Sequence, residues 1–180
     1  MAKFTTKITT RIQKFIEAQK MFFVATAPTS GRINLSPKGM DSFRVINENK
    51  VLWLNVTGSG NETAAHLAEN ERITIMFCSF EKVPNILRLY GKGKEIKPND
   101  KEWEEVISLF PETPGTRQIF DITIESTQSS CGMSIPFYEY KGEREDLNDW
   151  AIEQGQEKVE QYWEDRNQTS IDGLPTNIIK

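Results

Sequence analysis

The feature of this sequence that most constrains its fold is a series of short apolar or alternating segments between residues 21 and 125, separated by turn signals. Residues 72–80 are rich in β-branched and aromatic side chains, and residues 118–125 alternate between apolar and polar ones. Residues 86–96 fit a further strand, in which Gly91 and Gly93 predict a bulge or a close backbone approach. Such segments are typical of strands, and their short spacing favours antiparallel pairing over a parallel βαβ sheet. We therefore predict a mainly β, α+β fold: a barrel of six or seven strands with peripheral helices.

Helices are expected at the periphery of this barrel. Residues 6–19 carry apolar side chains on one helical face, and residues 99–110 begin with an asparagine and a glutamate at the spacing of a capping box. The chain becomes polar and helical near its end. We expect residues 1–140 to form the barrel domain, and residues 141–180 to form a C-terminal helix and tail packed on the same domain.

Charge and composition exclude several classes of function. The formal net charge is −4, so the protein as a whole has no electrostatic reason to bind nucleic acid or an anionic membrane surface. No apolar run is long enough to span a bilayer. The two cysteines, Cys78 and Cys131, are not at metal-ligand spacing, and the single histidine cannot build a zinc site. We expect a cytoplasmic protein with reduced thiols and no metal.

The most informative local motif is GSGNET at residues 58–63, which precedes a short helix rich in alanine and leucine. Ser59 and Glu62 have the spacing of a capping box. Glycines allow a close backbone approach, and the free N–H groups of a helix start bind phosphate readily. Side chains of Ser59, Asn61 and Thr63 could complete such a site. Spacing alone fits a plain capped helix better, because glycine and serine before helices are common.

Three other features carry possible chemistry. Lys38 lies in a turn predicted at residues 36–39, where it could meet a phosphate or a ring carbonyl, although a surface lysine is the simpler interpretation. Arg88 lies between two leucines of a predicted strand and is a candidate for a ligand or an ion pair. The polar run at residues 127–136 breaks the preceding alternation, as either a functional segment or an ordinary loop would. His66 is expected to have a hydrogen-bonded packing role.

Taken in order, these segments resemble the pyridoxamine 5'-phosphate oxidase-related FMN-binding proteins over most of the chain. The resemblance rests on six runs whose order and spacing together are specific: SPKG with DSF (36–43), TGSGNET with AHL (57–67), RIT with MFC (72–78), ILRLYG (86–91), SCG (130–132) and SIDGLP (170–175). The resemblance implies a split β-barrel, a homodimer, and two FMN sites that are each built from both subunits.

The positions that the resemblance assigns to FMN form three groups. The first group would lie along the flavin ring and contains Ser36, Pro37 and Lys38. The second group would hold the phosphate, with Arg88 nearby, and contains Ser59, Asn61 and Thr63. The third group would approach from the partner chain and contains Gln128, Ser129, Ser130 and Cys131.

The chain also departs from the pattern of the vitamin-oxidising members. Those enzymes place an Arg-Lys pair at the helix start, whereas this chain has Glu62 and Thr63 there, which moves the charge balance to Lys38 and Arg88. They also end in a strand with an arginine and a histidine, and this chain ends in a polar helix and tail. We expect an FMN-dependent oxidoreductase acting on a different small molecule, with unidentified catalytic residues. A non-catalytic module that binds flavin, deazaflavin or haem is the alternative.

Overall fold

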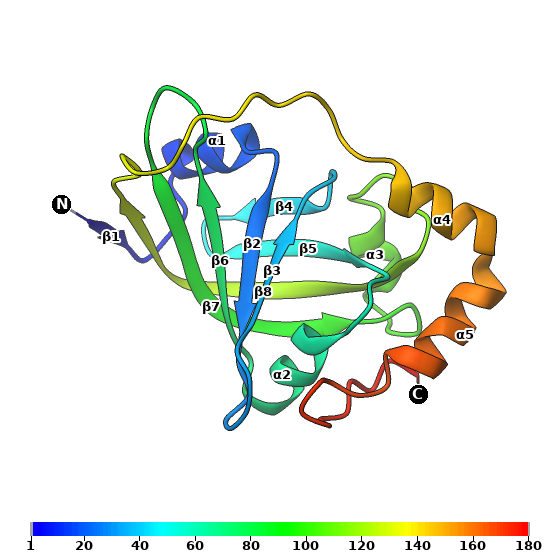
Figure 1. The fold of residues 1–180 in the computed structure, drawn as a ribbon. Helices are drawn as coiled ribbons and strands as arrows, with labels where there is room; N and C mark the ends of the chain where they lie inside the picture. The colour runs from blue at the N-terminus through cyan, green and yellow to red at the C-terminus, as the bar shows by residue number, and fades with distance from the viewer. Residues whose placement is uncertain (1, 180) are drawn as a thin grey trace.

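The structure, a computed structural model, describes residues 2–179 (Figure 1). Its strands are β1 (Lys3–Thr5), β2 (Phe22–Thr26), β3 (Asn34–Lys38), β4 (Phe43–Asn47), β5 (Lys50–Val56), β6 (Arg72–Cys78), β7 (Ile86–Ile96) and β8 (Thr116–Ser130). Its helices are α1 (Thr10–Ala18), α2 (Glu62–Asn70), α3 (Trp103–Ile107), α4 (Asp146–Gln154) and α5 (Gln156–Arg166).

All the strands join one antiparallel sheet in the order β3-β2-β6-β7-β8-β5-β4, with β1 paired to β8. The two long strands β7 and β8 run side by side through its middle, and β8 pairs with β5 in its first half and with β1 near its end. This division of β8 between two partners bends the sheet around an apolar interior, with the helices outside it (Figure 1).

A β-bulge between Tyr90 and Gly91 produces part of this bend. A Cβ atom at Gly91 would lie 2.1 Å from the carbonyl oxygen of Thr123, so only glycine permits this approach of β7 to β8. The bulge that the two glycines of residues 86–96 predicted is therefore confirmed.

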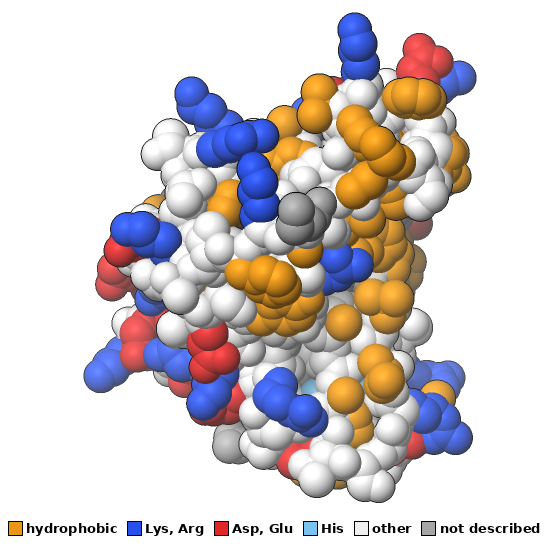
Figure 2. Space-filling model, turned by 90° about the vertical axis from the view of Figure 1, so that its left-hand side faces the viewer, with side chains coloured by type: hydrophobic (Ala, Val, Ile, Leu, Met, Phe, Trp, Pro, Cys, Tyr) orange, Lys and Arg blue, Asp and Glu red, His pale blue; other side chains and the backbone are white. Residues whose placement is uncertain are grey.

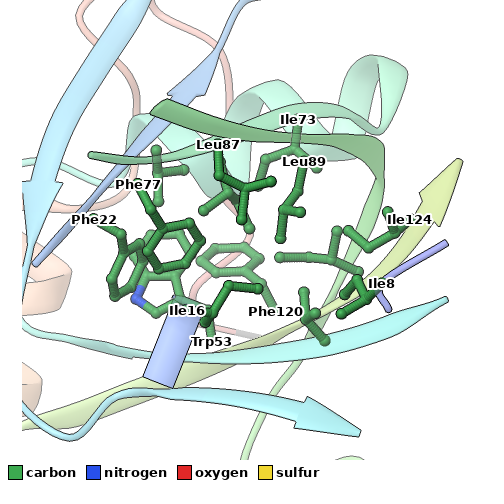
Figure 3. Close-up of a cluster of buried hydrophobic side chains, with 14 of the residues drawn as sticks. Ile8, Ile16, Phe22, Trp53, Ile73, Phe77, Leu87, Leu89, Phe120 and Ile124 are labelled. Atoms are coloured by element: carbon green, nitrogen blue, oxygen red, sulfur yellow. The ribbon is translucent and has the colours of Figure 1, made fainter. Parts of the chain in front are cut away.

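The interior of the barrel is filled by aliphatic and aromatic side chains from most of its strands and from α1 (Figure 3). Trp53 stacks on Phe120 with ring centroids 4.9 Å apart, and Phe22 packs against Phe77 at 5.6 Å. Both Trp53 and Phe120 are completely buried. Burial of apolar area on this scale is the main stabilising contribution to such a domain.

Two smaller clusters attach the later helices to the outside of the barrel. Leu52 and Leu54 of β5 face α3, and α4 and α5 pack together around Val159 and Trp163. The indole Nε1 of Trp163 donates to Oγ1 of Thr57 at 2.8 Å, which fixes α5 to the end of β5. The C-terminal helices therefore lie close to the loop that precedes α2.

The strand predicted at residues 86–96 is confirmed as β7, whereas both predicted helix ranges were too long. The helix expected at 6–19 is α1, which begins after its N-cap Thr9. The capped helix expected at 99–110 reduces to the five residues of α3, without a side-chain cap. Asp100 instead accepts a hydrogen bond from the backbone N–H of Lys97 at 2.8 Å, so the first residues form a turn.

Two predicted interruptions of strands were wrong. The turn expected at residues 36–39 is largely strand, because β3 continues through Lys38. Pro37 is tolerated there since β3 lies at the edge of the sheet and pairs only with β2. The polar run after residue 126 belongs to β8 as far as Ser130. Its polar side chains find partners on neighbouring strands, for example Gln128 Oε1, which accepts from the hydroxyl of Tyr90 at 2.8 Å.

Among residues 2–179, none of the helices combines the length and the apolar character needed to cross a bilayer. Both cysteines are free: Cys78 is buried, which raises the pKa of its thiol, and Cys131 is exposed.

Candidate functional site

The start of α2 leaves its first-turn N–H groups without a side-chain cap. The N-cap residue is Asn61, and the capping box predicted from Ser59 and Glu62 does not form. The side chain of Asn61 is instead paired with Gln118, whose Nε2 donates to Asn61 Oδ1 at 2.7 Å. The carboxylate of Glu62 accepts from the backbone N–H of Ile171. An uncapped helix start of this kind is suited to an anion.

A cavity of about 630 Å³ opens at this helix start, between β3, the beginning of β8 and the C-terminal segment that follows α5. It borders five of the positions that the resemblance assigned to FMN: Ser36, Lys38, Ser59, Asn61 and Thr63. Its volume lies within the range of small-molecule sites in proteins. The structure therefore brings these five residues, from β3 and from the segment at the start of α2, to the wall of one cavity.

Two cations at the cavity, Arg117 and Lys38, are held against the protein and have no carboxylate within ion-pair distance among the described residues. Arg117 has a side chain that is almost completely buried, with 4% of the residue exposed, and its Nη1 donates to Gly60 O at 3.2 Å and to Asn167 Oδ1 at 2.6 Å. Its Nε has no hydrogen-bond partner within residues 2–179. Lys38 places its ammonium 5.2 Å from the centroid of the Trp53 ring.

Burial shifts the pKa values of both cations. Desolvation and, to a smaller extent, the charge of Arg117 together lower the pKa of Lys38 to about 8. Desolvation also lowers the pKa of Arg117 to about 10, although Glu95 and Tyr162 partly oppose this effect. Positive charge at both positions is therefore held at a cost, which a bound anion would offset.

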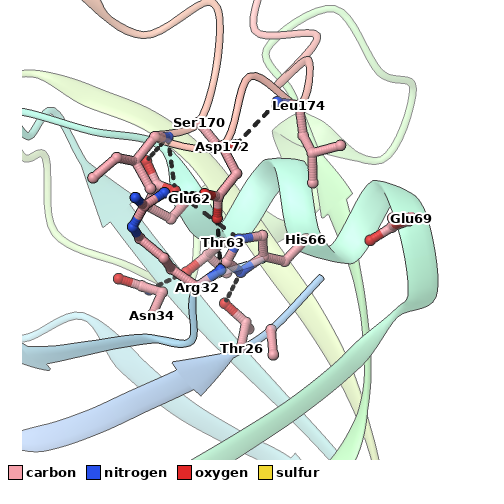
Figure 4. Close-up of polar contacts among 12 residues, drawn as sticks. Thr26, Arg32, Asn34, Glu62, Thr63, His66, Glu69, Ser170, Asp172 and Leu174 are labelled. Atoms are coloured by element: carbon pink, nitrogen blue, oxygen red, sulfur yellow. Dashed lines mark hydrogen bonds and ion pairs between the residues drawn. The ribbon is translucent and has the colours of Figure 1, made fainter. Parts of the chain in front are cut away.

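Acidic and imidazole groups gather around the first turns of α2, next to the part of the cavity wall formed by Arg32 and Glu62 (Figure 4). His66 is completely buried, and its Nδ1 is 3.0 Å from the hydroxyl of Thr26, which confirms the predicted hydrogen-bonded packing role. Its Nε2 lies 4.0 Å from Glu62 Oε2. Asp172 forms an ion pair with Arg32, whose guanidinium also borders the cavity.

The remaining positions assigned by the resemblance lie away from this cavity within one chain. Pro37 borders a second, mainly apolar groove of about 620 Å³, which also includes Phe80 and Tyr138. Arg88 donates to Ser130 Oγ at 3.3 Å, at the far end of the β7–β8 pair. The other three positions are also at that end: Gln128, Ser129 and Cys131.

Sequence reasoning missed Arg117, the most deeply buried cation of the site. It stands one residue before the alternating run that marked the predicted strand, so it resembled an ordinary loop residue. Neither its burial nor its contact with Asn167, fifty residues later, has a signal in local spacing. Within the described part of the chain, no three His, Cys, Asp or Glu side chains meet as metal ligands would.

The chain is similar in sequence to proteins of one known family. A family model described as Pyridoxamine 5'-phosphate oxidase matches residues 8–131. The Aspergillus flavus protein named "Pyridoxamine 5'-phosphate oxidase family protein ustO" is 35% identical over 177 residues, which cover 87% of this chain and 70% of that protein. The matched region contains α2 and most of the strands around the cavity.

Solved structures share the fold at low sequence identity. A Lactobacillus delbrueckii protein named after pyridoxamine 5'-phosphate oxidase aligns with a TM-score of 0.55 and 17% identity, covering 68% of this chain and 94% of its own. An FAD-binding protein from Mesorhizobium loti aligns with a TM-score of 0.50 and 12% identity, covering 72% of this chain and 99% of its own. These likenesses confirm the predicted split β-barrel.

Proposed function

The chain belongs to the pyridoxamine 5'-phosphate oxidase family, and from that premise we propose that it binds FMN and acts as an oxidoreductase on a small molecule. The phosphate of FMN would occupy the cavity at the start of α2. The flavin would supply the hydride or electron chemistry, and the protein would bind and orient it.

The observation that carries this proposal is an uncapped helix start beside Arg117 and Lys38, two cations that burial desolvates and that have no carboxylate within ion-pair distance among the described residues. A phosphate monoester is a dianion near neutral pH, so it could satisfy the N–H groups of α2, Lys38 and Arg117 together. Arg117 would take the place of the arginine and lysine that the helix start lacks. Because Glu62 already accepts from Ile171, its carboxylate is held by a donor and does not stand free beside the phosphate.

Side chains beyond the phosphate position could orient the rest of the cofactor. Ser36 and Lys38 lie on alternate positions of β3 along the cavity wall, and Asn34 links β3 to α2 through a 3.5 Å hydrogen bond to Thr63. Lys38 also borders the apolar groove beside Pro37, so its ammonium stands between a polar and an apolar compartment. A cofactor with an anionic end and a flat aromatic ring matches this division.

We further propose that the protein works as a homodimer. Figure 2 shows hydrophobic side chains spread over the face on which β1 lies in Figure 1. Large apolar side chains exposed in the single chain include Phe4, Val83, Met133, Phe137 and Tyr138. A second copy could cover such a surface, and the end of β8 with Cys131 could then reach the partner's cofactor site.

The test is a fluorescence titration with FMN, alongside an absorbance spectrum of the purified protein. Ser59 borders the cavity with an exposed side chain, so Ser59→Asp adds a negative charge there with little effect on packing. We expect FMN to bind about three- to tenfold more weakly to Ser59→Asp than to the uncharged control Ser59→Asn. Equal affinities of the two variants for FMN would contradict the proposal that the phosphate binds at this helix start.

Catalysis is tested separately on the FMN-loaded protein. Under anaerobic conditions, NADH or NADPH should bleach the flavin absorbance, and oxygen or an added acceptor should restore it. A bound flavin that neither nucleotide reduces would support cofactor binding and contradict the proposed use of these reductants. Light scattering of the same sample should give the mass of a dimer, and a flavin-loaded monomer would contradict the shared site.

A further inference from the structure

The segment that follows α5 folds over the cavity as a short strap, defined here as residues 167–176 (Figure 1). Its base is buried: the Asn167 amide accepts from Arg117 and donates to Gly58 O at 3.1 Å, and the hydroxyl of Thr176 donates to Asn167 O at 2.5 Å. A turn closed by a 2.8 Å hydrogen bond from Ser170 N to Leu174 O shapes the tip. The base therefore fixes the strap independently of contacts at its tip.

The tip of the strap holds the cation of the neighbouring β2–β3 turn (Figure 4). Asp172 Oδ2 accepts from the backbone N–H of Arg32 at 2.6 Å, and Oδ1 forms an ion pair with the Arg32 guanidinium. Gly31 allows this contact, because a Cβ atom there would lie 2.6 Å from Asp172 Oδ2. Together these two donors bind a carboxylate in the way that they could bind a phosphate oxygen.

We propose that Asp172 competes with the anionic group of the ligand for Arg32, a cation that borders the cavity. The carboxylate of Asp172 occupies Arg32 and so lowers the affinity of the cavity for phosphate. This inference rests on the proposed function, since it concerns the same cavity. When the ligand binds, Arg32 would exchange the carboxylate of Asp172 for the ligand's phosphate. Removing the carboxylate frees Arg32 for the phosphate, and it also removes one negative charge beside the cavity.

The accessibility of the ion pair makes such an exchange feasible. The Arg32 side chain is 67% exposed, so the guanidinium is open to solvent and to a ligand, whereas the Asp172 side chain is only 15% exposed. Water therefore screens the pair mainly from the side of Arg32. The strap base, in contrast, is buried and held by several hydrogen bonds. The backbone N–H of Ile171 also stays bound to Glu62 when Asp172 changes. Loss of the Asp172 charge should therefore leave the strap in place.

The experiment compares Asp172→Asn with the unmodified protein in titrations with FMN and with riboflavin, which lacks the phosphate. Asparagine keeps an oxygen that can accept from Arg32 N–H and removes only the charge. We expect FMN to bind about two- to fivefold more tightly to Asp172→Asn, and riboflavin to bind equally to both proteins. In an Arg32→Gln background, Asp172→Asn should give a clearly smaller gain, because only the loss of the negative charge remains and no cation is released.

Several outcomes would overturn the inference. Unchanged or weaker FMN binding by Asp172→Asn would show that the carboxylate does not compete, and an equal gain for riboflavin would show a change in cavity shape. A gain of the same size in the Arg32→Gln background would exclude Arg32 as the contested cation.

A parallel calorimetric titration with inorganic phosphate separates this inference from the cofactor assignment. If neither protein binds flavin but Asp172→Asn binds phosphate more tightly, the competitor stands and the FMN proposal fails. If FMN binds with equal affinity to both proteins, the FMN proposal stands and the competitor fails. If neither flavin nor phosphate binds to either protein, both proposals fail.

Discussion

The barrel interior and the cavity beside α2 differ in whether their buried side chains find contact partners within the chain. In the interior, rings such as Trp53 and Phe120 contact one another and are completely enclosed by the chain. At the cavity, Arg117 is almost as deeply buried, yet its Nε has no partner within residues 2–179, and Lys38 has no carboxylate near its ammonium. The side chains of the interior find their contacts within the chain, whereas the cations at the cavity keep donor groups without a partner among the described residues.

This difference separates what stabilises the fold from what the protein binds. Buried apolar groups lower the free energy of the folded state, whereas buried charges without counterions raise it. Buried charges of this kind lower the stability of the ligand-free protein and raise its affinity for an anionic ligand. The comparison predicts that substitutions in the interior change stability, and that substitutions at the cavity change ligand affinity.

The largest effect is expected in the interior, from Phe120→Ala. Loss of the ring that stacks on Trp53 should lower the free energy of unfolding by about 3–5 kcal/mol, because both the buried contact and the filled volume disappear. Urea denaturation followed by circular dichroism measures this. Ile152→Ala is the control, since Ile152 on α4 is 66% exposed and its loss should cost less than about 0.5 kcal/mol. Equal destabilisation by the two substitutions would contradict the claim that the barrel interior provides the stability of the fold.

The next largest effect is expected at the cavity, from Arg117→Met. Methionine has a similar length without the charge, so the affinity for FMN should fall about 10- to 100-fold, as expected for loss of charge-assisted hydrogen bonds. Arg11→Met, on the exposed surface of α1, removes the same charge elsewhere and should leave the affinity unchanged. Wild-type FMN affinity in Arg117→Met would remove this residue from the proposed phosphate site.

A smaller effect is expected from pH, through Lys38. Its pKa in the folded protein is about 8 because of burial and the charge of Arg117, so the ammonium is charged at pH 7 and largely neutral at pH 9. FMN affinity should therefore fall about five- to tenfold over this interval, because the bound dianion favours the charged form. Lys38→Met should make the affinity nearly independent of pH here. An unchanged pH profile in that variant would assign the proton to another group.

The same shift has a consequence for stability without ligand. Because the pKa of Lys38 is lower in the folded than in the unfolded chain, its charge opposes folding below pH 8, and this effect is relieved as pH rises toward the ordinary value of 10.5. Lys38→Met should therefore raise the melting temperature at pH 7 and have less effect at pH 10. A variant less stable than wild type at pH 7 would contradict this.

The smallest effect on ligand binding is expected where α5 meets the barrel. Thr57→Val removes the hydroxyl that accepts from Trp163 Nε1 and donates to Gly115 O at 2.8 Å. The stability should fall by about 1–2 kcal/mol, since a buried indole N–H loses its partner. The FMN affinity should change less than about twofold. A large loss of affinity would show that the position of α5 controls the cavity.

The sequence predicted much of the fold because alternation and turn residues are local signals. The strand at residues 86–96 and its bulge at Gly91 could be read directly. Pro37 led to the wrong prediction of a turn at residues 36–39. A proline without an N–H group is tolerated in a strand at the edge of a sheet, and the edge position of β3 depends on segments distant in the sequence. The polar end of β8 misled it too, since Gln128 is satisfied by a neighbouring strand.

The candidate site was predictable only in part, for the same physical reason. Ser59, Asn61 and Thr63 stand in one motif before a helix, and local spacing identifies such a start. Arg117 and the strap reach the cavity from the beginning of β8 and the end of the chain, through contacts with no local signature. The family resemblance supplied the position of Lys38, and only the structure brought Arg117 beside it.

The central claim is that the phosphate of FMN lies between the start of α2, Lys38 and Arg117. A crystal structure of the protein grown with FMN tests it most directly. The account predicts phosphate density within hydrogen-bond distance of the N–H groups of residues 61–63 and of the Arg117 guanidinium. FMN bound elsewhere, or a phosphate that contacts neither the helix start nor Arg117, would contradict it.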